Sequence, residues 1–167
     1  MKDCFDRNFR RAILAQLTFI NRHSLPHHVP LGVNPQKEVY FITITCQHRG
    51  RIQLTRPELA GPLLDIVKLR NERFVWFAYI FLIMPDHVHA LLSFPPSRNT
   101  IQQTVTLWKR WTARQMGIEW QRDFFEHRLR SDERWREKAD YIPANPVRKG
   151  LVTEVSQWPY VFLPNPR

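Results

Sequence analysis

Two histidines separated by one residue, His87 and His89, stand in the apolar segment "IMPDHVHALLSF" at residues 83–94. Residues i and i+2 of a β-strand point to the same face, so a strand here would place both imidazoles on one side of a sheet. Each neutral imidazole offers a nitrogen lone pair, and two of them can converge on one divalent ion. The pair alone is weak evidence, because such pairs also occur by chance and a catalytic metal needs a third protein ligand.

A third ligand can come from the segment "ADYIPANP" at residues 139–146. Tyr141 and Asn145 are four residues apart, so a helix would place them on one face, one turn from each other. The carboxamide oxygen of Asn145 suits a hard cation. Tyr141 offers a phenol, although a tyrosine most often buries its ring and leaves the hydroxyl in water. Pro143 lies between them and predicts a kink that would change how the two side chains face each other.

Composition points to a polyanionic partner. The 167-residue chain has a formal net charge of +10 and a pI of about 10.3, with the basic excess in residues 1–60 and 107–149. A basic folded domain favours nucleic acid, although solubility alone also explains such a charge. Two cysteines, Cys4 and Cys46, form no disulfide framework and no CxxC metal pair, which favours a reducing cytosol. We expect no signal peptide and no membrane span.

The order of predicted elements favours an α+β, ferredoxin-like fold. Strands are expected at residues 38–47, 73–84, 87–94 and 118–125, and helices at residues 55–73, 100–116 and 131–142. The order β-α-β-β-α-β predicts a four-stranded antiparallel sheet with two helices on one face, the split βαβ arrangement. The last helix is left to cover the other face, which is the face of the histidines.

Three parts of the chain are expected to differ in organisation. Residues 1–36 read as an N-terminal arm, rich in proline near its end, and residues 37–152 as the catalytic domain. Residues 153–167 are expected to form a C-terminal tail.

The motifs "MPDHVHALL" and "DYIPANPVRKGLV", some fifty residues apart, resemble the HUH-type tyrosine transposases of the IS200/IS605 class. More closely, they resemble the REP-associated tyrosine transposases (RAYT) of bacteria. The segment "WQRDFFEHRLR" at residues 120–130 and the arm motif "LPHHVP" are similar to that subfamily too. The resemblance covers roughly residues 25–158, and the order and spacing of its motifs is much more specific than the histidine pair alone.

The resemblance implies an endonuclease and strand transferase that cuts single-stranded DNA beside hairpins of repetitive extragenic palindromes (REP elements). Carried onto this sequence, it makes Tyr141 the nucleophile of a 5′-phosphotyrosine intermediate. His87, His89 and Asn145 become ligands of Mg²⁺ or Mn²⁺. It also implies a bacterial protein, cytoplasmic and associated with the nucleoid, that acts as a monomer more readily than as a dimer.

Contacts with DNA are predicted on basic segments with interleaved aromatic residues, because cations bind phosphates and aromatic faces stack on unpaired bases. In "LWKRWTARQ" at least one of the two tryptophans is expected in the core. The predicted DNA-binding residues are Lys109, Arg110, Arg114, Arg122, His127, Arg130 and Arg148. His127 could instead shuttle a proton or pack in the protein, and the arm is expected to help grip the hairpin.

Three other functions remain open from the sequence. A non-catalytic nucleic-acid-binding domain would need no metal, although "RFVWFAYIF" lacks the glycine-rich pattern of RNA-recognition motifs. A rolling-circle initiator or relaxase shares the histidine pair, but the short chain favours the transposase. A metal hydrolase is the weakest alternative, since no carboxylate beyond Asp86 accompanies the histidines.

Overall fold

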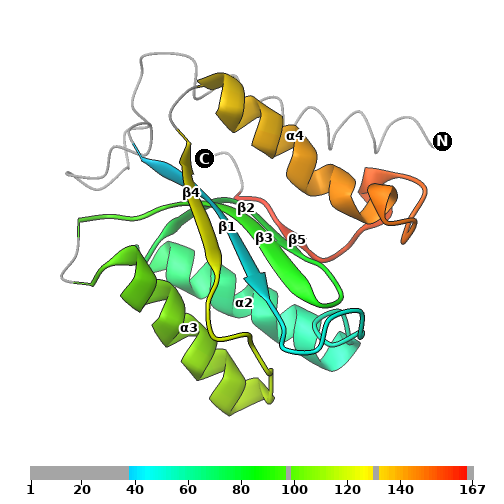
Figure 1. The fold of residues 1–167 in the computed structure, drawn as a ribbon, viewed down its shortest axis with the longest axis horizontal. Coiled ribbons are helices and arrows are strands. Elements are labelled where there is room, and N and C mark those ends of the chain that lie inside the picture. The colour runs from blue at the N-terminus through cyan, green and yellow to red at the C-terminus, as the bar shows by residue number, and fades with distance from the viewer. Residues whose placement is uncertain (1–37, 97–98, 130–131, 165–167) are drawn as a thin grey trace.

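The computed structural model describes residues 38–96, 99–129 and 132–164 of the chain. Strands and helices follow one another along it in the predicted order β-α-β-β-α-β, followed by a further helix (Figure 1). In chain order the elements are β1 (Val39–Thr45), α2 (Pro57–Glu72), β2 (Phe77–Ile83), β3 (His87–Ser93), α3 (Ile101–Met116), β4 (Phe125–Leu129), α4 (Asp132–Arg148), the 3₁₀ turn η1 (Val155–Gln157) and β5 (Val161–Phe162).

The strands form one antiparallel sheet in the order β4-β1-β3-β2-β5. The central strands are rich in β-branched and aromatic residues, and every residue of β3 is buried. Strand β1 pairs with β3 so that Thr43 lies opposite His89 and Thr45 opposite His87. Directly opposed residues of an antiparallel pair share a face, so these two threonines lie on the histidine face. The predicted ferredoxin-like arrangement is confirmed, with one strand added at the β2 edge.

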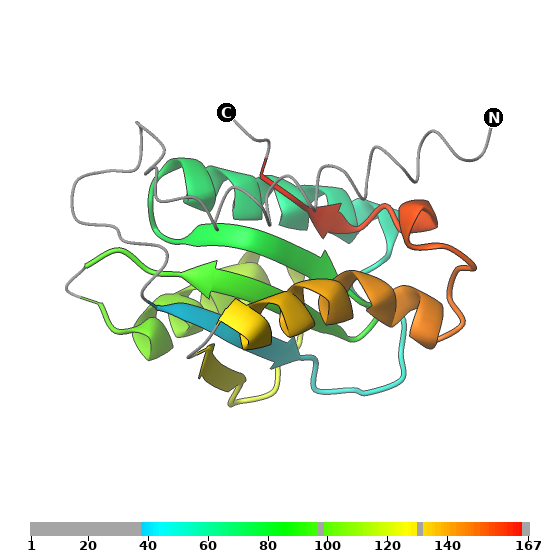
Figure 2. The same cartoon turned by 90° about the horizontal axis from the view of Figure 1, so that it is seen from above.

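Two hydrophobic layers cover the two faces of the sheet. Helices α2 and α3 pack on the face opposite the histidines, around Ile42, Val88, Leu63 and Trp108. Helix α4 packs on the histidine face through Trp135, Ala139 and Ile142, which contact a second cluster around Phe41 and Leu91. The two views of the ribbon show the same division, with α4 across the sheet from α2 and α3 (Figures 1 and 2). Within the described residues, no helix has the length and apolar character needed to cross a membrane.

The fourth strand begins later than predicted, and the described part of the predicted tail packs on the sheet. The fourth strand was predicted at residues 118–125 but spans Phe125–Leu129, because Ile118 is drawn into the α2–α3 core and Trp120 makes only an isolated bridge to Cys46. The predicted tail, residues 153–167, contributes strand β5, which pairs with β2. The Trp158 indole also donates a hydrogen bond to the Ile83 carbonyl (3.0 Å), so this segment is part of the domain.

Helix α4 contains Pro143, where a kink was predicted, and Pro146, and it reaches Arg148, six residues beyond its predicted end at residue 142. Pro146 has no N–H to give the Ile142 carbonyl. The side-chain amide of Asn145 donates to that carbonyl (3.2 Å) and to the Tyr141 carbonyl (2.8 Å). The Asn145 side chain therefore replaces the backbone hydrogen bond that Pro146 cannot make. Tyr141 and Asn145 stay on consecutive turns of the helix.

Candidate active site

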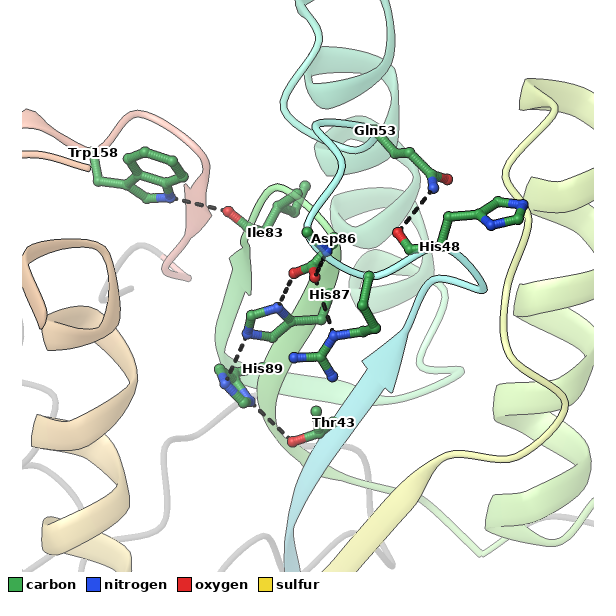
Figure 3. Close-up of polar contacts among 10 residues, drawn as sticks. Thr43, His48, Gln53, Ile83, Asp86, His87, His89 and Trp158 are labelled. Atoms are coloured by element: carbon green, nitrogen blue, oxygen red, sulfur yellow. Dashed lines mark hydrogen bonds and ion pairs between the residues drawn. The ribbon is translucent and has the colours of Figure 1, made fainter. Parts of the chain in front are cut away.

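The histidine pair lies at one end of β3, on the face that α4 covers (Figure 3). The Nε2 atoms of His87 and His89 are 3.2 Å apart, and each residue is only 8% exposed. The two side chains leave the same face of β3 because they are two residues apart, and Phe41 of β1 stacks on the His89 ring (centroids 5.5 Å, interplanar angle 22°). The predicted convergence of the two imidazoles is therefore present.

The Nδ1 atom of each histidine, on the far side of the ring from the paired Nε2 atoms, makes a hydrogen bond that fixes the ring. His87 Nδ1 donates to the Asp86 carboxylate over 2.6 Å, and His89 Nδ1 is 2.9 Å from the Thr43 hydroxyl. Asp86 is fixed in turn by the Gly50 N–H (2.8 Å) and the Arg49 Nε–H (3.1 Å). Such outer partners set the orientation of an imidazole and choose which nitrogen keeps its lone pair.

Burial keeps both imidazoles neutral at physiological pH. Loss of water, with smaller contributions from the charges of His87, Arg49 and Lys138, lowers the pKa of His89 to about 3. Burial also lowers the pKa of His87, and this outweighs the Asp86 carboxylate that acts in the other direction. Burial raises the pKa of Asp86, but hydrogen bonds from Gly50 and His87 and the nearby positive charges bring it below its ordinary value. The pair is neutral and backed by a carboxylate.

The donor set fits a divalent cation. Because His87 Nδ1 carries the proton bound to Asp86, His87 Nε2 has a lone pair directed at His89. In the tautomer with the His89 proton on Nε2, that N–H donates to the His87 lone pair. In the other tautomer His89 donates from Nδ1 to Thr43, and both Nε2 lone pairs are then available. Their separation of 3.2 Å is less than twice a metal–nitrogen bond of about 2.1 Å, so both nitrogens can reach one ion.

The described residues offer few further metal ligands beside the two histidines. Among the described residues, no group of three or more His, Cys, Asp or Glu side chains is arranged to hold a metal. Cys46 is fully buried, and burial raises the pKa of its thiol to about 12, so it remains a protonated core residue. Among the described residues, Asn145 offers a neutral oxygen as the predicted third ligand. Both hydrogen bonds of the Asn145 side chain are donated by its amide nitrogen. Metal binding by its carboxamide oxygen stays a prediction.

Tyr141 of α4 faces the histidine pair. Its half-buried ring lies edge-on to His89 (centroids 5.9 Å) and to Phe41 (6.3 Å). Two cations approach the same ring: Lys138 Nζ lies 5.2 Å and Arg148 Cζ 5.0 Å from its centroid. Positions 138, 141 and 148 lie on one face of the helix, so α4 presents the phenol between two positive charges.

The predicted DNA-binding residues divide into two groups. Arg148 lies at Tyr141, and His127 is exposed on β4 opposite Phe41, on the histidine face. Arg122 is exposed after Gln121, whose N–H donates to the Thr45 carbonyl at the histidine end of the sheet. Arg110 and Arg114 sit on α3, across the sheet from the site. Arg130 and the N-terminal arm lie outside the described residues.

Lys109 is not placed for a phosphate. It is 6% exposed, and its ammonium donates to the Arg122 carbonyl (2.8 Å) and the Asp123 carbonyl (3.3 Å), so it ties α3 to the segment before β4. Trp108 is fully buried, as expected for at least one of the two tryptophans, whereas Trp111 is 43% exposed.

Several site residues were missed from the sequence, although patterns pointed to some of them. Phe41 and Thr43 alternate along β1 with the period of a strand, but their register against β3 depends on tertiary pairing. Lys138 is three residues before Tyr141 and could have been found by helical spacing. Arg49 belongs to a loop whose contact with Asp86 follows from the fold alone.

Comparison with known proteins finds relatives in the family that the sequence motifs resemble. The chain is 30% identical over 138 residues to a Haemophilus influenzae protein assigned as a REP-associated tyrosine transposase, covering 73% of this chain and 77% of the relative. It is 29% identical over 123 residues to the REP-associated tyrosine transposase of Escherichia coli, covering 72% and 73%. No family model matches. The fold matches a solved REP-associated tyrosine transposase bound to a REP hairpin, with a TM-score of 0.65, 23% identity and 82% coverage of each chain.

An antiparallel α+β domain with a histidine strand and a tyrosine helix on one face thus defines a tyrosine transposase, an enzyme that cuts DNA. The chain belongs to the family of REP-associated tyrosine transposases.

The low pKa of His89 predicts that the protein loses stability in mild acid. The unfolded chain binds a proton below the ordinary value of 6.5, while the folded protein keeps His89 neutral down to about 3. Stability is therefore complete above pH 6.5 and falls as the pH drops from there. Urea unfolding at pH 7 and pH 5 should show a decrease of about 2 kcal/mol in the free energy of unfolding. His89→Gln should flatten this dependence, whereas His48→Gln, at a more exposed site, should not. Equal stability at the two pH values in the wild type would contradict the assignment.

Proposed function

We propose that this transposase cuts and rejoins single-stranded DNA beside REP-type hairpins through a covalent bond between Tyr141 and the 5′-phosphate. The observation that carries the proposal is the juxtaposition of the converging His87 and His89 Nε2 atoms with the Tyr141 ring, 5.9 Å from His89 between centroids. All three side chains come from one chain, which supports a site that a monomer can complete.

His87, His89 and Asn145 are the residues proposed to hold a divalent ion, Mg²⁺ or Mn²⁺. Asp86 and Thr43 orient the two imidazoles, and α4 places Asn145 one turn beyond Tyr141. A bound ion would neutralise charge on the scissile phosphate and make its phosphorus more open to attack.

Tyr141 supplies the nucleophile in this proposal. Its hydroxyl oxygen attacks the phosphorus and forms an O–P bond, the bond from phosphorus to the 3′-oxygen breaks, and the departing oxygen takes a proton to become a free 3′-OH. The phenolic proton leaves to water. Because the phosphotyrosine keeps the energy of the original diester, a 3′-OH can reverse the step and join strands without ATP.

The surroundings of Tyr141 suit a DNA strand. Lys138 and Arg148 lie at its ring, Arg49 flanks the histidine pair, and their charges can bind the phosphates on either side of the cut. The hairpin is proposed as the substrate because a solved structure of the same fold contains a transposase bound to a REP hairpin. We place this activity in the bacterial cytoplasm at the nucleoid.

Tyr141→Phe tests the nucleophile. The wild type should form a covalent adduct with labelled single-stranded hairpin DNA in the presence of Mg²⁺, seen as a shifted band after denaturation. Removing the hydroxyl should lower adduct formation and cleavage by at least about 10³-fold while DNA binding persists. The matched control is Tyr160→Phe, which makes the same change at a tyrosine that packs on Trp158 in the C-terminal segment. This variant should cleave normally. Cleavage by Tyr141→Phe at the wild-type rate would refute the role.

Asp86→Asn tests the orientation of the metal ligands. The amide cannot hold the His87 Nδ1 proton as the carboxylate does, so the affinity for Mn²⁺ should fall about 10- to 100-fold by calorimetry. Glu119→Gln makes the same chemical change at an exposed acid that pairs with His48, and should bind Mn²⁺ as the wild type does. Unchanged affinity in a folded Asp86→Asn protein would show that the backing carboxylate plays no part.

A further inference from the structure

Phe125 is a large apolar side chain left in water on the face of the active site. It is 57% exposed at the start of β4, which is one of the two edge strands of the described sheet. It lies opposite Thr43 of β1, which in turn lies opposite His89 of β3. Phe125, Thr43 and His89 therefore form one cross-strand row on one face, with Phe125 about 10 Å from His89 at two strand spacings.

Aromatic rings connect Phe125 to the tyrosine. Phe125 lies edge-on to Phe41 (centroids 6.2 Å), and Phe41 lies edge-on to Tyr141 (6.3 Å). Lys138 Nζ is 5.3 Å from the Phe41 centroid and 5.2 Å from that of Tyr141. Of these three rings, Phe125 is exposed, Tyr141 is half-buried and Phe41 is buried between them. Single exposed apolar residues are common on proteins, but here exposure, rings and a cation occur in line with the nucleophile.

That combination fits an unpaired nucleotide. Aromatic faces stack on bases of any sequence, and cations between them bind the phosphates that join successive bases. In a duplex each base already stacks on both neighbours and presents only its edges, so a phenyl ring on a sheet surface favours a single strand. The positive charges around the Tyr141 ring, Lys138 and Arg148, complement a nucleic-acid strand and not an apolar partner.

We propose that Phe125 is a stacking platform for an unpaired base next to the cleaved phosphate, with the strand running from the exposed edge at β4 toward Tyr141. The proposal rests on the proposed cleavage of single-stranded DNA and adds the residue that selects unpaired DNA at the edge of the site. Because phenylalanine has no hydrogen-bonding group, this position contributes affinity for single strands without a preference among bases.

The test compares two probes in EDTA, so that no cleavage occurs: a 20-nucleotide thymidine strand and a blunt duplex of the same length, both fluorescently labelled. Phe125→Ala should weaken binding of the single strand about ten-fold and leave the duplex unchanged. Phe125→Trp should restore single-strand binding. Phe74→Ala removes a side chain of similar exposure (54%) after α2 and is the matched control, with no expected effect.

A second measurement uses the wild-type protein and does not depend on a variant folding. Strands carrying 5-iodouracil should crosslink on irradiation to a stacked ring, and peptide mapping should find the adduct on Phe125. Three results would overturn the proposal: unchanged single-strand affinity in Phe125→Ala, an equal loss for both probes, or a wild type that binds the single strand no better than the duplex. Crosslinks confined to α3 would do the same. Absence of a covalent hairpin adduct would count against the cleavage proposal instead, because neither measurement here involves cleavage.

Discussion

The hydrogen bonds behind the two histidines are the constraint on which the site depends. A histidine pair on a strand can bind one cation only if the imidazoles are neutral and their nitrogens are aimed at one point. Asp86 and Thr43 hold the outer nitrogens, burial suppresses protonation, and the two Nε2 atoms meet 3.2 Å apart. Remove either partner and the rings can turn about their χ2 bonds, which would separate lone pairs that must act together.

The sheet and α4 bring the nucleophile to that point from two directions. The register of β1 against β3 places Phe41 and Thr43 beside His89, and the apolar side chains of α4 pack on the same strands. Ala139 is fully buried where the helix meets the sheet, and its small side chain allows the backbone to come close. Asn145 stabilises the helix at Pro146, so the turn carrying Tyr141 keeps its direction. One folding unit therefore supplies every group at the centre of the site.

Much of this arrangement follows from the sequence, and the rest depends on tertiary pairing. Alternation along 87–93 predicts that both histidines share the face left for the last helix, and the spacing of Tyr141 and Asn145 predicts a common helical face. The boundaries of β4 could not be predicted, because "IEWQRDFF" has the local composition of a strand while Ile118 is taken into another layer. Pro143 and Pro146 favour an early end of α4, and the compensating amide of Asn145 is visible only in three dimensions. Lys109 looks like a surface cation in sequence, yet two carbonyls from a loop draw it inward.

The central claim, that His87 and His89 share one cation beside Tyr141, is tested most directly by anomalous diffraction from crystals grown with Mn²⁺. The account predicts a single strong peak bonded to both Nε2 atoms, on the side of the sheet that α4 covers. Manganese bound through only one of the two imidazoles, or held by surface carboxylates with the histidines still paired to each other, would contradict it.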